Sequence, residues 1–394
     1  MTDWPTVKLG EVLAERRPRV PVEPETDYLM AGVFGFGRGI LLRGAVRGSD
    51  ISAQHLFKIA AGQIVYSRLK AFEGAFALVP PEGDGRFVTN EFPTFDVDEE
   101  RALPGFVALV LSLPATWQQL AQRITGVGAR RERLQVTDFL DFEVDLPPLR
   151  LQERTMGAVK VLDQLTDAAE RAAAASALVL QATQLEMWDR LFEDAPIRRL
   201  GDVTSVASGG TPSRQRPEYF GGEICWVKTG EVNFTSIRDT EEHLTAAGVA
   251  NSSAKVFPAE TVVVAMYGQG ATRGRCGILE RDMATNQACA AIQPSTDLRP
   301  RFLFHLLWSR YEALRAEGEG SSQANLNKGL IEALEVPVPP LDEQERVIKT
   351  LDRLLVARVA AATEVEALRK LRRVLVEDLV AGIREVPDVD LLQV

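Results

Sequence analysis

The most constraining feature of this sequence is that it repeats itself at a nearly constant interval. Four short segments recur in the same order, each 189 to 196 residues after its first copy. Convergent helix-start chemistry would explain the proline-rich pair alone, but the other segments lie far from any expected helix start. We therefore expect two copies of one unit, each a mixed globular part followed by a helix. The paired segments are Val7–Val12 with Arg199–Val203, Thr89–Glu91 with Thr285–Gln287, Leu146–Arg154 with Val338–Arg346, and Leu162–Leu165 with Leu351–Leu354.

The segment after each Pro-Pro pair is predicted to form a long helix. Residues 152–192 and 343–381 contain no proline and, apart from Gly157, no glycine. We expect Asp342 to cap the second helix, with Glu345 three residues on. About 40 residues at 1.5 Å each gives roughly 60 Å per helix, so two such helices packed antiparallel would form a stiff spacer.

A seven-residue repeat in the second helix predicts a coiled-coil seam. It is interrupted by Arg358 and Arg372. The seam positions are Val347, Leu354, Ala361, Leu368 and Leu375, with partner positions Leu351, Val365 and Leu379.

The globular parts are predicted to be α/β or α+β with short strands. Apolar or alternating runs bounded by turn formers at residues 63–67, 75–79, 142–146 and 261–266 are typical of strands. Residues 106–122 and 301–316 each read as one amphipathic helix. The expected domains are 1–150, a first spacer helix at 151–193, 194–340, a second spacer helix at 341–382 and a tail at 383–394. Together they would form two similar globular domains separated by an antiparallel coiled coil, with a pseudo-twofold internal repeat.

Composition and motifs argue against several classes of protein. The chain has 394 residues, with 45 Lys and Arg against 55 Asp and Glu, so its net charge is −10. Three scattered cysteines argue against a disulfide framework or a structural zinc site. Without an apolar signal region or spanning segment, we expect a cytoplasmic protein.

Catalytic motifs are absent from the sequence. It contains no P-loop, no GxSxG elbow and no [DN]PP[YF] tetrapeptide. The histidines His55, His243 and His305 are isolated in sequence, and Cys225 is expected to be a small buried apolar residue. We therefore expect no enzyme activity, no metal and no bound cofactor.

Local basic clusters on glycine-bearing loops, at matching places in the two copies, favour nucleic-acid binding. Arginine and lysine reach guanine or phosphate, and asparagine and glutamine pair with adenine. The alternative is solvated loop charge. The candidate DNA-binding residues are Arg68, Lys70, Arg130, Arg131 and Arg133 in the first copy, and Arg214, Arg216, Lys228, Thr229, Gln269, Arg273, Asn325 and Lys328 in the second.

Taken together, these motifs resemble the specificity (S) subunits of type I restriction-modification enzymes. The resemblance rests on TVKLGEV and its echo RRLGDV, SGGTPS before YFGGEICWVKTGEV, TNQ, and PVPPLDEQERVIKTLDRL with its earlier copy LPPLRLQERTMGAVKVLDQL. The first copy departs from it, since residues 15–19 replace the GGTP loop and Leu151–Glu153 replaces the EQ signature.

The resemblance implies two target-recognition domains that each read half of a split, asymmetric DNA site. It implies spacer helices that dock two methyltransferase (M) subunits, which use S-adenosylmethionine, and a core joined by restriction-translocase (R) subunits. The subunit itself would be non-catalytic and would bind no cofactor. The alternatives are the specificity subunit of a type IIB-like restriction system and a coiled-coil scaffold without DNA contact; an enzyme acting on DNA alone is improbable.

Overall fold

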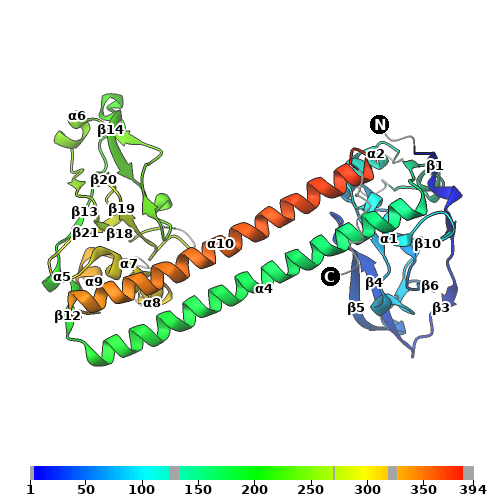
Figure 1. Ribbon diagram of the computed structural model, residues 1–394, viewed down its shortest axis with the longest axis horizontal. Coiled ribbons are helices and arrows are strands. Elements are labelled where there is room, and N and C mark those ends of the chain that lie inside the picture. The colour runs from blue at the N-terminus through cyan, green and yellow to red at the C-terminus, as the bar shows by residue number, and fades with distance from the viewer. Residues whose placement is uncertain (1–3, 124–132, 269–270, 318–325, 385–394) are drawn as a thin grey trace. The chain divides into compact units, whose positions relative to one another are not determined.

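The computed structural model describes residues 4–123, 133–268, 271–317 and 326–384. The chain divides into two compact units, Met1–Ala169 with Val365–Val394 (unit 1) and Glu170–Glu364 (unit 2). Both contain small sheets and short helices, and both include part of two long helices (Figure 1). The mixed α/β fold class expected from the sequence is therefore confirmed.

The described residues of unit 1 form three sheets. The first sheet pairs β1 (Thr6–Lys8) with β11 (Glu143–Asp145). The second sheet has the strand order β2 (Leu13–Glu15), β10 (Thr94–Val97), β7 (Ile64–Tyr66), β8 (Phe76–Leu78). The third sheet has the strand order β3 (Arg19–Pro21), β6 (His55–Lys58), β9 (Phe87–Val88), β4 (Asp27–Val33), β5 (Ile40–Arg47). The helices are α1 (Pro104–Leu111), α2 (Pro114–Ala121) and α3 (Val136–Leu140).

Unit 2 follows the same plan. One sheet pairs β12 (Ile197–Arg199) with β22 (Glu335–Pro337). A second sheet has the strand order β13 (Val206–Ser208), β21 (Cys289–Ile292), β18 (Val262–Ala265), β19 (Cys276–Leu279), β15 (Ser236–Ile237). A third sheet has the strand order β16 (His243–Leu244), β14 (Phe220–Val227), β20 (Met283–Thr285), β17 (Val256–Phe257). The helices are α5 (Leu200–Val203), α6 (Ala246–Ala250), α7 (Pro300–Ser309), α8 (Tyr311–Glu317) and α9 (Lys328–Ala333).

The internal repeat is visible in the strand pairing. The order β2-β10-β7-β8 recurs as β13-β21-β18-β19, and β6-β9-β4-β5 recurs as β17-β20-β14-β16. The equivalent pair in each of these sheets is parallel, β4 with β9 through Met30 and Phe87, and β14 with β20 through Trp226 and Ala284. Unit 2 has a further parallel pair, β15 with β19. Two units whose recurring strands have the same order and the same pairing directions share one topology, as the repeated segments predict.

Each unit has its own core. In unit 1, Tyr66, Phe76, Phe95 and Phe139 pack ring against ring. In unit 2 the β18 run Val262–Ala265 is fully buried, and its sheet is covered by α7 through Phe302 and neighbouring side chains (Figure 1). Apolar burial on both faces explains why β18 reads as a continuous apolar run rather than an alternating one.

The two long helices are α4 (Leu149–Asp194) and α10 (Leu341–Val380). In unit 1, Asp163 of α4 pairs with Arg372 of α10, and the α4 residue Val159 shares a buried cluster with Val376. Because the α10 partner number falls as the α4 number rises, the helices run antiparallel there. In unit 2, Arg190 near the end of α4 pairs with Glu343 near the start of α10, so the two helices are antiparallel there as well (Figure 1).

The coiled-coil seam predicted for the second helix is also present. Val347, Leu351, Val365 and Leu379 are buried, and the remaining predicted seam positions are half-buried. The interrupting arginines have partners of their own. Arg372 bonds Asp163, and the Arg358 guanidinium lies 5.4 Å from the ring centroid of Trp308.

One buried glutamine in each unit fixes the start of its long helix. Gln344 donates to the carbonyls of Asp297 (2.8 Å) and Pro339 (2.9 Å) and accepts from the amide of Arg299 (2.8 Å). Gln152 makes the same contacts with Arg101, Pro147 and Leu103. The departure of the first copy from the EQ signature therefore leaves this glutamine's function intact.

Three helix predictions were wrong. Each expected amphipathic helix is broken into two, because Pro114 begins α2 after an extended Leu113, and because Arg310 leaves helical geometry after α7 and donates to the carbonyl of Glu335. Asp342 does not cap α10, which begins one residue earlier; it lies in the first turn and pairs with Arg346. Within the described residues, no helix is both long and apolar enough to cross a bilayer.

Candidate nucleic-acid interface

In unit 2 the glycine loop after β13 meets the segment after β20. The amide of Gly210 donates to the carbonyl of Thr285, and the Trp226 indole donates to the carbonyl of Gly210 (3.0 Å). A Cβ at Gly209 would lie 1.9 Å from the Thr285 carbonyl oxygen, so this close approach requires glycine. The SGGTPS, CWVK and TNQ motifs, which are far apart in the sequence, therefore form one surface.

Two of the predicted cations on this surface share one carboxylate. Arg214 donates to both Glu242 oxygens, and the Lys228 ammonium lies 2.9 Å from Glu242 and 2.9 Å from Glu241. We call Arg214, Lys228, Glu241 and Glu242 the Glu242 cluster. Hydrogen bonds from Arg214 and then Lys228 lower the pKa of Glu242 to about 2, so this carboxyl is ionised at neutral pH.

Aromatic rings and backbone bonds fix the Glu242 cluster. The Arg214 guanidinium lies 4.5 Å from the centroid of Phe220 and 5.3 Å from that of Trp226. The amide of Trp226 donates to the carbonyl of Glu242 (3.1 Å), which holds the glutamate beside β14. The arginine is therefore held on two sides before any ligand arrives.

The neighbouring predicted residues lie close in the chain. Thr229 begins the short 3-10 turn Thr229–Glu231, whose Glu231 side chain accepts from the amide of Lys228 (2.7 Å). Arg216 is exposed and pairs with Glu218 at 3.3 Å.

Unit 1 places its TNE segment in the corresponding position. Glu91 accepts from Arg133 through two hydrogen bonds of 3.1 Å, and this pairing raises the pKa of Arg133. The Arg17 guanidinium donates to the Asn90 side chain (3.0 Å) and lies over Phe57. Arg68 donates to the side chain of Gln135. Lys70 pairs with Glu73 at 3.2 Å.

The other predicted residues lie elsewhere or outside the described part of the chain. Arg273 donates to the carbonyl of Arg315 in α8. Lys328 begins α9 and pairs with Glu332 at 3.1 Å. Arg130, Arg131, Gln269 and Asn325 lie outside the described residues, so their place as contact residues remains a prediction.

Sequence reasoning missed several residues of these surfaces. Arg17, Asn90 and Glu91 in unit 1, and Glu242 with Gln287 in unit 2, hold the predicted cations or loops in place. The TNE and TNQ repeat was a usable signal for Asn90, Glu91 and Gln287. Glu242 lies in a segment with no repeat in the first copy.

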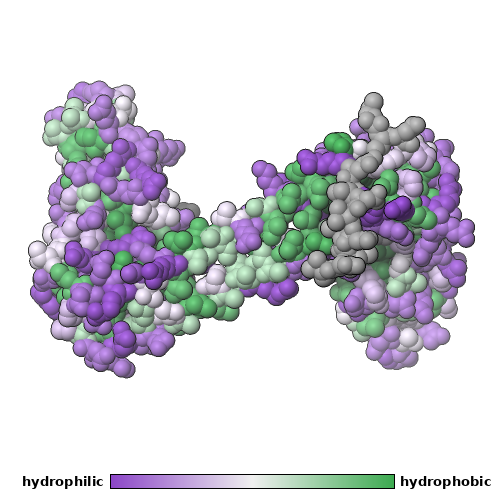
Figure 2. Space-filling view, viewed as in Figure 1, coloured by the Kyte–Doolittle hydropathy of each residue, from purple (hydrophilic) through white to green (hydrophobic). Residues whose placement is uncertain are grey.

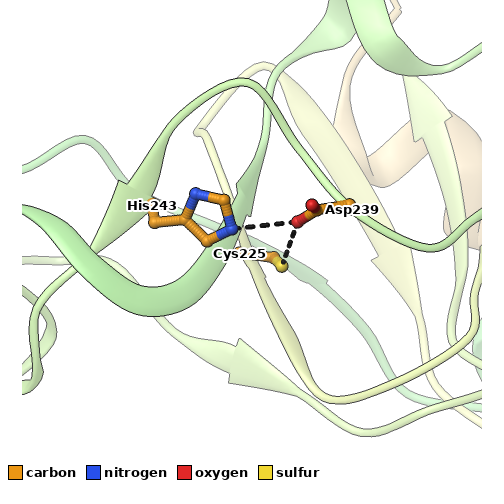
Figure 3. A group of neighbouring side chains, drawn as sticks. All are labelled: Cys225, Asp239 and His243. Atoms are coloured by element: carbon orange, nitrogen blue, oxygen red, sulfur yellow. Dashed lines mark hydrogen bonds and ion pairs between the residues drawn. The ribbon is translucent and has the colours of Figure 1, made fainter.

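Cys225, Asp239 and His243 form a further polar group in unit 2 (Figure 3). The same Asp239 oxygen lies 3.3 Å from the thiol and 2.9 Å from the His243 ring nitrogen, and these bonds, that of the thiol first, lower the pKa of Asp239. Cys225 is buried in an apolar cluster, as predicted, but its contact with Asp239 and the bond of His243 to the same carboxylate were not foreseen.

A guanidinium supplies positive charge to this group. Arg281 lies 2.7 Å from the Cys225 sulfur and 3.0 Å from Asp239. A metal ion would have to displace it, so the group is best described as a hydrogen-bonded network that joins β14 to β16, where Cys225 pairs with His243.

Comparison with known proteins gives one consistent result. Residues 193–363 match the family model described as the type I restriction modification DNA specificity domain. The chain is 28% identical over 160 residues to the EcoR124I/EcoR124II specificity subunit of Escherichia coli, covering 40% of each protein. It is 21% identical to the HindI specificity subunit of Haemophilus influenzae over 97% of this chain and all of that protein.

Solved structures share the fold. The HsdS subunit from Thermoanaerobacter tengcongensis has a TM-score of 0.58 at 20% identity, covering 96% of this chain and 97% of that one. A chain from a structure of the complex assembly and conformational transition of the type I R-M system has a TM-score of 0.67 at 19% identity and the same coverage. The aligned regions of the E. coli relative and of one from Methanocaldococcus jannaschii span only 40% and 38% of those proteins. Through the family model over residues 193–363, the near-full-length relative and the shared fold, the chain is similar to type I restriction-modification specificity subunits.

Proposed function

We propose that this chain is the sequence-reading subunit of a type I restriction-modification complex. Unit 1 reads one part of a bipartite, asymmetric DNA site and unit 2 reads the other. The chain is non-catalytic, and S-adenosylmethionine binds to the partner methyltransferase subunits. The domain boundaries proposed from the sequence, 1–150 and 194–340 for the recognition domains, belong to the same proposal.

One observation carries the proposal. Two units of the same topology each gather cationic and amide side chains around the segment after equivalent strands, Asn90–Glu91 after β9 and Asn286–Gln287 after β20. Arginine, lysine, asparagine and glutamine are the side chains that pair with base edges and phosphates in the major groove. A duplicated surface of this chemistry suits a split recognition site.

We propose the residues predicted from the sequence as DNA contacts, and we add Arg17, Asn90, Asn286 and Gln287. The contacts carried over from the sequence are Arg68, Lys70, Arg130, Arg131, Arg133, Arg214, Arg216, Lys228, Thr229, Gln269, Arg273, Asn325 and Lys328.

We further propose that the long helices dock the methyltransferase subunits, with restriction subunits joining that core. Apolar side chains on both helices are exposed, among them Leu178 (66%) and Leu185 (60%) on α4 and Val356 (68%) on α10. Figure 2 shows apolar surface along these helices and hydrophilic side chains over much of the sheets. Exposed apolar surface of this extent is typical of a protein interface.

Mapping of methylated adenines in cells with and without this gene tests the proposal. We expect one split motif to lose methylation when the gene is removed. We also expect Arg214→Ala to change one part of that motif and Arg133→Ala to change the other. Unchanged methylation on removal of the gene would contradict the proposal.

A further inference from the structure

Carboxylates pair with most of the proposed DNA-contacting cations that the structure describes. In unit 2, two of these cations pair with a glutamate close by in the chain, Arg216 with Glu218 and Lys328 with Glu332. The pairs at the two TNE and TNQ surfaces join residues distant in the chain, Arg133 with Glu91 and Arg214 with Glu242. These two surfaces therefore carry cations whose charge is already compensated.

The compensation is tightest in the Glu242 cluster. Two cations face two carboxylates, and Glu242 alone accepts two bonds from Arg214 and one from Lys228. A carboxylate that chelates a guanidinium is among the strongest ionic contacts in proteins. The pKa of Glu242 near 2 means that protonation does not release the cations at neutral pH.

The two units reach this arrangement with different residues. Glu91 belongs to the TNE segment, whose counterpart in unit 2 is Gln287, an uncharged residue that bonds Thr211. In unit 2 the carboxylate comes instead from Glu242, just before β16. Each unit therefore places a carboxylate on a cation of this surface, and the two carboxylates come from different parts of the repeat.

Compensated cations affect DNA binding in a specific way. Affinity that does not depend on sequence comes from cations that replace counterions on phosphates, and each such cation steepens the salt dependence. A cation held by an internal carboxylate must exchange that carboxylate for a phosphate. Its net contribution to the sequence-independent affinity for DNA is therefore small.

We propose that Glu242 and Glu91 are internal counter-anions that hold Arg214, Lys228 and Arg133 and thereby suppress sequence-independent DNA binding. This inference rests on the proposed DNA-reading function. The carboxylates act through the cations and are positioning residues rather than DNA contacts.

The test uses the full chain and two duplexes, one selected by the wild-type protein from a randomised library and one with the same bases scrambled. Affinity is measured over a series of salt concentrations for the wild type, Glu242→Gln and Glu91→Gln. We expect each variant to bind the scrambled duplex about five- to tenfold more tightly near 0.1 M salt. The slope of log affinity against log salt should steepen by about 0.9 for each additional phosphate that the variant neutralises.

Matched controls remove the same charge elsewhere. Glu280→Gln breaks the 2.8 Å pair with Arg238, and Glu25→Gln breaks the pair with Arg47. Both should leave the slope within error of the wild type, and Glu242→Asp, which keeps the charge, should stay close to the wild type. Thermal unfolding of each variant confirms that it is folded.

Three results would overturn the inference: slopes for Glu242→Gln and Glu91→Gln equal to those of the controls, weaker binding to both duplexes, or a Glu242→Asp slope as steep as that of Glu242→Gln. Weaker binding would mean that the carboxylates orient the arginines for reading. A wild-type protein that binds both duplexes equally would instead contradict the proposed function, and the slope comparison on the scrambled duplex would still stand.

Discussion

Gln344 holds together three chain segments that meet at the start of α10. Its side chain satisfies the amide of Arg299 and the carbonyls of Asp297 and Pro339, and it is fully buried. A glutamine side chain has one acceptor oxygen and a two-proton donor group, so it can make all three bonds at once. Gln152 repeats the arrangement in unit 1, which explains why a glutamine follows both Pro-Pro pairs.

Replacing Gln344 by alanine should therefore destabilise unit 2. Each buried polar group left unpaired costs about 1–3 kcal/mol, and we expect a total loss of about 2–3 kcal/mol in the free energy of unfolding. Urea unfolding measures it. The exposed Gln215→Ala is the control and should change stability by less than about 0.5 kcal/mol. Equal losses in the two variants would contradict this role for Gln344.

His305 should make stability depend on pH. Its imidazole is 1% exposed and bonds Asp352 at 2.7 Å, while Arg301 bonds the same carboxylate. Burial lowers the pKa of His305 below its ordinary value of 6.5, and it outweighs the opposing effect of Asp352. The unfolded chain therefore binds a proton at a pH where the folded chain does not.

This difference in proton binding sets the direction in which the free energy of unfolding changes with pH. Stability is fully present above about pH 6.5 and is lost as the pH falls below it, by up to about 1.4 kcal/mol per pH unit until the folded imidazole also protonates. Urea unfolding at a series of pH values should show this slope, and His305→Gln should reduce it. A slope unchanged by the substitution would assign the pH dependence to other groups.

Some of these residues could be predicted from the sequence and others could not. Lys228 and Arg214 could be chosen because they lie in or beside the glycine-bearing segments SGGTPS and CWVKTGEV. Glu242 could not, because its role depends on β16 pairing with β14, which brings a residue 28 positions away onto Arg214. Long-range pairing of this kind leaves no local signal.

At the scale of elements, α4 contains one glycine with space around it. A Cβ at Gly157 would meet nothing within 4 Å beyond the helix itself, whereas Gly221, equally open, has a φ of +79°. Glycine within a helix costs roughly 0.5–1 kcal/mol relative to alanine, and a positive φ disfavours alanine.

The same substitution should therefore have opposite effects at the two positions. Gly157→Ala should raise the free energy of unfolding by about 0.5–1 kcal/mol, and Gly221→Ala should lower it by about 1 kcal/mol. Denaturant midpoints of the two variants give the comparison. Destabilisation by Gly157→Ala would mean that the helix surface at this point is already occupied.

The elements themselves were predicted with uneven success for physical reasons. The α10 seam followed from its seven-residue period, and the arginines in it are accommodated by Asp163 and Trp308. The breaks between α1 and α2 and between α7 and α8 were missed. Pro114 was a visible signal for the first, but the break at Arg310 depends on a tertiary bond to Glu335.

At the scale of the whole molecule, the repeat determines how the two proposed reading surfaces depend on one another. Arg133 and Arg214 lie in separate units, and their carboxylate partners, Glu91 and Glu242, are different residues. Arg214 and Lys228, in contrast, share Glu242. Energetic coupling requires a shared partner or contact, so these two pairs of cations should behave differently.

A pair of double-mutant cycles on binding to the selected duplex measures this difference. Arg133→Ala and Arg214→Ala should each cost about 1–3 kcal/mol and should add within about 0.5 kcal/mol, because each surface reads its own part of the site. Arg214→Ala and Lys228→Ala should deviate from additivity by more than about 0.5 kcal/mol, because removing either cation leaves Glu242 to the other. Strong coupling between Arg133 and Arg214 would mean that the two units do not read DNA independently, and the duplication would then need another explanation.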